Sequence, residues 1–143
     1  MIIVTFDPGI TTGVAIYRDG HYRSEEIDST NLTSIYNYLE YCGDSEPNIA
    51  YEDFKHRPGL IKTELYSIQV IGVIRLWASQ RELPEPKCWL PATIKAFWTD
   101  DKIKALGLWK KGQGHAMDAL RVLLKYRMDT DPDWFKDVLR DLH

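Results

Sequence analysis

The sequence has few cysteines, no long apolar run and no large excess of charge of either sign. Its two cysteines, Cys42 and Cys88, show no CxxC or CxxH spacing. This argues against a structural zinc or redox motif and predicts buried free thiols in a reducing cytoplasm. No run of about 18 apolar residues occurs, so we expect no membrane span. The first residues lack a basic flank and a small-residue cleavage site, as expected for a core strand rather than a signal peptide. These absences predict a cytoplasmic protein.

The composition is that of an ordinary globular protein, 44% apolar and 27% charged. The 143 residues leave no room for two full cores, so we expect a single domain, 1–143. A net charge of -3 argues weakly against a nucleic-acid partner, but the charge is uneven, because residues 54–111 hold eleven Lys/Arg and five Asp/Glu. This basic middle is consistent with a phosphate-facing surface, and a solvated lysine-rich face explains it equally well.

The apolar pattern predicts a mixed sheet covered by helices on both faces. A hairpin of strands comes first, turning at Asp19-Gly20, and helices and strands then alternate. We expect strands at 2–6, 14–17, about 22–27, 48–51 and 88–90. The expected helices run from an N-cap at Thr30 to a stop at Gly43, and over 62–79, 91–97, 100–108, from just after Gly114 to about 128, and 131–142. The main apolar stripe of the 62–79 helix is expected at Leu65, Ile68, Gly72, Arg75 and Ala78.

Acidic residues stand where core elements end or begin. Asp7 follows the first strand, within an Asp-Pro-Gly that is also common turn chemistry. Glu52 and Asp53 end the fourth strand and point to opposite faces, so only one can join Asp7, and parity alone cannot choose. His115 and Asp118 are three residues apart at a helix start and therefore share one face, although each is also compatible with a structural role. Taken together, two strand-end acids and a helix-start acid are typical of two-metal phosphoryl-transfer sites.

The three motifs, their order and the chain length resemble the RuvC family of Holliday junction resolvases, in the ribonuclease-H-like superfamily. The small phage-encoded branch is the most similar. By this resemblance Asp7 in IVTFDPG is the first acid, Glu52 in YED is the second, and Asp118 in HAMDAL is the last. His115 falls where some members carry Asp and others His. The resemblance runs to about residue 128 and implies a ribonuclease-H-like mixed five-stranded sheet with helices on both faces.

The resemblance implies a metal-dependent, structure-selective endonuclease that resolves Holliday junctions and other branched DNA by paired phosphodiester hydrolysis. The expected catalytic and metal-ligating residues are Asp7, Glu52, His115 and Asp118. They would hold Mg²⁺ or Mn²⁺, with two ions per site about 4 Å apart, one activating the attacking water and one stabilising the leaving oxygen. The products would carry 5′-phosphate and 3′-hydroxyl ends. If the protein is phage-encoded, it would act in the cytoplasm of the host cell.

The resemblance also suggests how the DNA and a second subunit would bind. Phe54 or His56 would take the place of the family's aromatic residue that probes the junction centre. The candidate DNA contacts are basic residues of the middle segment: Lys55, His56, Arg57, Lys95, Lys102, Lys110 and Lys111. A two-fold-symmetric junction needs two nicks, which predicts a homodimer. The expected interface is the 62–79 helix, through Ile71 and Ile74, with the helix from Trp134 to Leu142 as second choice.

Two other functions are compatible with parts of the sequence. An ATP-binding protein of the actin and sugar-kinase type also begins with a strand and a phosphate turn, but 143 residues are too few for its two lobes. It also gives no reason for His115 and Asp118. A non-catalytic DNA-binding module would use the basic middle alone, and acids at all three matching positions argue against it.

Overall fold

The computed structural model describes residues 1–42, 46–54, 58–59 and 62–142. Its strands are β1 (Ile2–Asp7), β2 (Thr11–Arg18), β3 (His21–Asp28), β4 (Asn48–Glu52) and β5 (Lys87–Trp89). Its helices are α1 (Thr33–Cys42), α2 (Lys62–Gln80), α3 (Pro91–Lys95), α4 (Asp100–Ala105), α5 (Gly114–Thr130) and α6 (Pro132–Asp141). The strands form one sheet in the order β3-β2-β1-β4-β5. β2 runs antiparallel to β1 and β3, whereas β4 runs parallel to β1 and β5.

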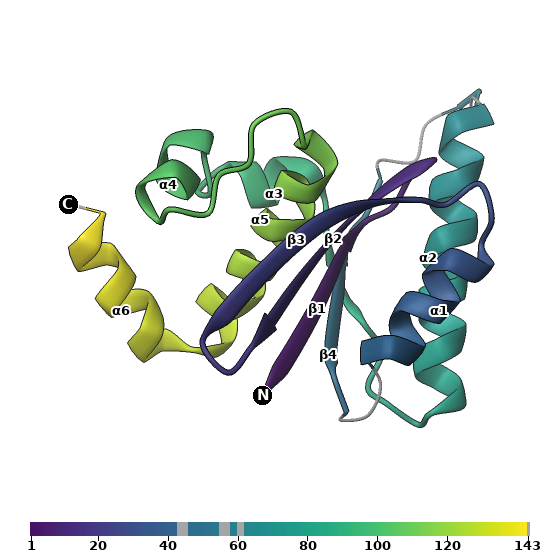
Figure 1. Ribbon diagram of the computed structural model, residues 1–143, viewed down its shortest axis with the longest axis horizontal. Helices are drawn as coiled ribbons and strands as arrows, with labels where there is room; N and C mark the ends of the chain where they lie inside the picture. The colour runs from purple at the N-terminus through teal and green to yellow at the C-terminus, as the bar shows by residue number, and fades with distance from the viewer. Residues whose placement is uncertain (43–45, 55–57, 60–61, 143) are drawn as a thin grey trace.

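Each face of the sheet carries its own apolar core. Figure 1 shows α1 and α2 on one side of the sheet and the other four helices on the opposite side. Because side chains alternate along a strand, Ile3 of β1 joins the core beneath α5 while Val4 and Phe6 join the core beneath α1 and α2. Thr5, on the α5 face, donates its hydroxyl to the backbone oxygen of Ala119 at 2.7 Å. This arrangement confirms the predicted mixed sheet with helices on both faces.

Most of the apolar stripe expected for α2 lies on the exposed side of the helix, and of its members Ala78 is buried in the core. Ile74 and Trp77 are fully buried, whereas Leu65 is 47% exposed and Ile68 is 38% exposed. Ile74 therefore belongs to the protein's own core and is not a surface residue of a dimer interface. Apolar residues lie all round this helix, so their spacing could not identify the face that meets the sheet.

Three further local features differ from the sequence predictions. Thr30 is not an N-cap, because α1 begins later and the amide of Thr30 donates to the Asp28 side chain at 2.9 Å. The helix expected over 100–108 ends at Ala105, before Gly107 with its φ of +73°. Cys88 is exposed, contrary to the prediction of two buried thiols. The expected helix stop at Gly43 lies outside the described residues.

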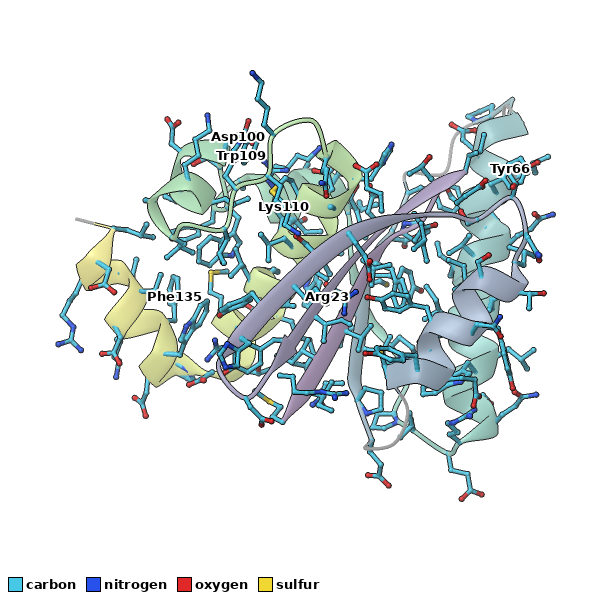
Figure 2. All side chains as sticks on the ribbon, in the orientation of Figure 1. Arg23, Tyr66, Asp100, Trp109, Lys110 and Phe135 are labelled. Carbon is cyan, nitrogen blue, oxygen red and sulfur yellow. The ribbon has the colours of Figure 1, made fainter. Side chains whose placement is uncertain are left out.

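α6 continues the core beyond the segment covered by the family resemblance. Phe135 of α6, labelled in Figure 2, packs edge-on to Phe97 with ring centroids 5.4 Å apart. Trp134 stacks over the buried guanidinium of Arg127 at 4.2 Å. The apolar face of α6 is thus used within the chain. Within the described residues, no helix is both long enough and apolar enough to cross a membrane.

Candidate active site

Three acidic residues lie in one row across the sheet at the carboxyl end of its central strand, β1: Glu26, Asp7 and Glu52. Asp7 pairs with Gly13 of β2, and Gly13 pairs with Glu26 of β3. On the other side, Phe6 pairs with Tyr51, so Glu52 follows beside Asp7. Ala50, two residues before Glu52, belongs to the core beneath α5. Strand alternation therefore puts Glu52 on the α5 face with Asp7, which answers the parity question that the sequence left open.

The first turn of α5 lies directly over this row. A Cβ atom on Gly13 would stand 1.8 Å from the backbone oxygen of His115, so only glycine permits this approach. The backbone amide of His115 donates to Glu26 Oε1 at 3.2 Å. Its ring Nδ1 lies 3.0 Å from Asp7 Oδ2. Carboxylates from two different strands therefore fix the position of His115.

Asp118 faces two basic side chains. Its Oδ1 accepts a hydrogen bond from Arg121 Nη1 at 2.6 Å. The Nζ of Lys95, on α3, lies 3.6 Å from the same oxygen. Lys95 is therefore the basic residue that approaches the acids among the described residues of the segment predicted to contact DNA.

Burial and mutual repulsion disfavour the charged forms of two of these acids. Burial raises the pKa of Asp7 to about 6, with the hydrogen bond to His115 opposing the shift and the charge of Asp118 adding to it. Burial, followed by the charges of Asp7 and Asp118, raises the pKa of Glu52 to about 8. Lys95 and Arg121 oppose that shift only in part. A cation that entered this row would relieve the repulsion.

In the part of the chain that the structure describes, one carboxylate oxygen of the row has no hydrogen-bond partner. Glu52 Oε2 is buried and makes no hydrogen bond within the described residues. As the side chains stand, no three histidine, cysteine or acidic residues in the described part of the chain could hold a metal ion together. The contacts above account for this, because Asp7 is engaged with His115 and Asp118 with Arg121. The donors themselves, three carboxylates and one imidazole, fit a divalent cation such as Mg²⁺ or Mn²⁺.

Two cavities flank Asp7 and give access to the row. One, of 280 Å³, is lined by Glu52 and Phe54 as well as Asp7. The other, of 350 Å³, is lined by His115 and the turn that follows β1. Glu64, in the first turn of α2, borders both cavities. A substrate that reached the acids through either cavity would pass Glu64.

The other predicted DNA contacts differ in how they are placed. Lys102 donates to the backbone oxygen of Phe97 at 3.0 Å and covers that ring. Lys110, labelled in Figure 2, donates to the backbone oxygen of Ser24 at 2.5 Å. Lys111 is exposed. The predicted contacts Lys55, His56 and Arg57 lie outside the described residues.

Sequence reasoning did not single out Glu26, Glu64 or Arg121. Arg121 could have been found, because a basic residue three positions after Asp118 lies on the same helix face. Glu26 could not, because its proximity to His115 depends on the register of three strands. Glu64 could not either, because its place beside Asp7 depends on how α2 docks on the sheet.

Comparisons with known proteins support the fold. No protein-family model matches the sequence, and no curated protein matches it. Among solved structures, the chain is similar to Thermus thermophilus RuvC in complex with a Holliday junction substrate, at 17% identity and a TM-score of 0.68. That match covers 92% of this chain and 96% of the other. A second Thermus thermophilus RuvC structure matches at 18% identity and a TM-score of 0.58, covering 85% of this chain and 90% of the other.

These likenesses identify a ribonuclease-H-like fold of the RuvC type. At so low an identity they show the fold alone. Both structures come from a bacterium, so they lend no support to the phage-encoded branch suggested by the sequence motifs.

Proposed function

We propose that this protein is a divalent-metal-dependent endonuclease that cuts branched DNA, with Holliday junctions as its main substrate. The observation that carries the proposal is the buried Oε2 of Glu52 beside Asp7, which has no hydrogen-bond partner among the described residues. An uncompensated carboxylate in a core costs stability, and a ligand cation is the simplest compensation. The RuvC-type fold, whose matched structure is bound to a Holliday junction, supports the choice of substrate.

In this proposal Asp7, Glu52 and Asp118 supply the oxygen ligands, and His115 is either a fourth ligand or a proton carrier. Bound Mg²⁺ or Mn²⁺ ions, two per site, would polarise the attacking water and stabilise the leaving oxygen of the phosphodiester. The hydrogen bond from His115 to Asp7 orients that carboxylate. Lys95, beside Asp118, can balance the charge of an approaching phosphate.

The proposed DNA-contacting surface lies around Lys95 and extends to the exposed Lys111. Lys102 and Lys110 would contribute mainly by holding that surface in place, because their ammonium groups bind backbone oxygens. The surface borders the acid row, so contacts with phosphates on either side of the cut could align the substrate.

We also propose a homodimer, because a four-way junction is two-fold symmetric and one chain supplies one set of acids. The candidate interface remains α2, but on the face that carries Leu65, Ile68 and Leu76. Leu76 is 58% exposed, and Gly72 on this helix has open space around it, so a second helix could approach closely. The alternative interface, α6, has its large aromatic residues packed within the chain.

The test is incubation with a synthetic four-way junction and Mg²⁺ or Mn²⁺, beside a linear duplex of the same sequence. The proposal predicts metal-dependent, paired nicks in the junction and little cutting of the duplex. A non-catalytic DNA-binding module would bind the junction and leave it intact. An ATP-binding protein of the actin type would bind nucleotide and show no preference for the junction.

A further inference from the structure

The Arg121 side chain is a buried cation held by three acceptors. It is 8% exposed and follows Asp118 by one helical turn on α5. Its Nε donates to the backbone oxygen of Trp98 at 2.9 Å, and its Nη1 donates to Asp118 Oδ1 at 2.6 Å. Its Nη2 donates to Asp100 Oδ1. A buried guanidinium with all three nitrogens engaged has little freedom to turn.

These contacts connect Asp118 to the corner between α3 and α4. Trp98 is fully buried at this corner. Thr99 caps α4, accepting a hydrogen bond from the amide of Lys102. Asp100, the first residue of α4, lies on the α5 side of the sheet (Figure 2). The position of Asp118 is thus determined by this corner as well as by the helix that carries it.

The positive charge of Arg121 is shared between two carboxylates, those of Asp100 and Asp118. Asp100 contributes a second carboxylate to the same guanidinium, so the cation does not simply neutralise Asp118. What Arg121 supplies to Asp118 is therefore mainly a direction. Within the described residues, the contacts of the Asp118 carboxylate are made at Oδ1. No contact of the other oxygen, Oδ2, is seen among those residues, so a ligand could bind to it.

We infer that Arg121 is a positioning residue for the reaction proposed above, because it turns Asp118 so that Oδ2 alone faces a bound divalent cation. This inference rests on the proposed function and adds a determinant of metal binding outside the three acids. Partners that orient a metal ligand typically contribute about 10- to 100-fold in metal affinity or activity. Lysine cannot replace arginine here, because one ammonium group cannot bridge two carboxylates and a carbonyl with the same geometry.

The experiment compares Arg121→Lys and Asp100→Asn with a matched control, Arg127→Lys. Arg127 is also a buried arginine of α5, and it pairs with Asp131 at 3.3 Å, away from the acids. For each variant, Mn²⁺ affinity is measured without DNA from the electron paramagnetic resonance signal of free Mn²⁺. Thermal unfolding, and kcat and KM for a four-way junction at saturating Mn²⁺, are measured on the same preparations.

We expect Arg121→Lys to weaken Mn²⁺ binding about 10-fold or more and to lower kcat, with KM for the junction little changed. Asp100→Asn should weaken Mn²⁺ binding less, because Arg121 keeps its bonds to Asp118 and Trp98. Arg127→Lys should lower the unfolding temperature while Mn²⁺ affinity and kcat stay at their wild-type values.

Folded Arg121→Lys with the Mn²⁺ affinity and kcat of the wild type would overturn the inference. If Arg121→Lys does not fold, unchanged Mn²⁺ affinity in Asp100→Asn overturns it instead. If these variants are unaffected and the wild-type protein cuts junctions, the inference fails but the proposed function stands. A wild-type protein that neither binds Mn²⁺ nor cuts junctions would overturn both.

Discussion

The backbone oxygen of His115 lies 1.8 Å from the point where a side chain on Gly13 would begin. This contact between β2 and the first turn of α5 sets the height of the helix above the acid row. His115 and Asp118 both depend on it, since they project from that turn toward Asp7. A single missing Cβ atom in β2 therefore determines the geometry of a site built largely from other elements.

Gly13→Ala should displace the start of α5 from the sheet. The added methyl group meets backbone atoms, which cannot move aside as a side chain can. We expect the free energy of unfolding to fall by about 1–3 kcal/mol. We also expect the rate of junction cutting to fall by more than the loss of folded protein accounts for. Denaturant unfolding and cutting kinetics measure the two effects. Gly114→Ala is the control, because its Cβ would meet nothing within 4 Å; equal losses in both variants would contradict the account.

Stability of the metal-free protein should fall as pH rises, because Asp7 and Glu52 have raised pKa values. For Glu52 the unfolded chain ionises near 4.5 and the folded chain near 8. Between these values the folded state binds more protons, so ionisation is opposed and stability decreases with increasing pH. Glu52→Gln removes this penalty and should raise Tm at pH 8, by roughly 3 °C for each kcal/mol regained.

The measurement is thermal unfolding in EDTA at pH 5 and pH 8. Adding Mn²⁺ should stabilise the wild type at pH 8 more than Glu52→Gln. A Tm difference between the two proteins that is the same at both pH values would show that Glu52 does not titrate in this range.

Much of the fold was predictable from the sequence, and the site only in part. The strand pairs could be inferred because the apolar runs end at turn residues such as Asp19-Gly20. The acids Asp7 and Asp118 stand out because they interrupt apolar patterns. The docking face of α2 was not predictable, since Leu65 and Val70 are equally apolar and only tertiary packing separates exposed from buried. Glu26 was not predictable because its contact with His115 requires the exact register of β3.

Metal preference should depend on His115. Imidazole is a softer ligand than carboxylate and is better tolerated by Mn²⁺, so wild-type activity with Mn²⁺ should equal or exceed that with Mg²⁺. His115→Asp should move the ratio toward Mg²⁺. Cutting rates at saturating concentrations of each ion give the ratio, with the exposed His21→Asp as control. If His115→Asp leaves the ratio of the Mn²⁺ and Mg²⁺ rates unchanged, His115 is not a metal ligand. Its contact with Asp7 would then be its role in the site.

Charge on the exposed face of α2 should break the proposed homodimer. Ile68→Glu combined with Leu76→Glu places two carboxylates where apolar side chains would meet, at little cost to the monomer because both residues are exposed. Sedimentation velocity should show a wild-type dimer and a monomeric variant. Tyr41→Glu, an exposed change on α1, is the control. A wild type that is monomeric both free and on the junction, yet still makes paired nicks, would refute the dimer.

The central claim is that Asp7, Glu52 and Asp118 form one metal-dependent cutting site. The most direct measurement follows an end-labelled four-way junction with Mg²⁺ or Mn²⁺ in the presence of wild type, Asp7→Asn, Glu52→Gln or Asp118→Asn. We predict symmetric nicks with the wild type and none with any variant, while gel-shift affinity for the junction is retained, because phosphate contacts come from the basic segment. Undiminished cutting by any one of the three variants would contradict the account.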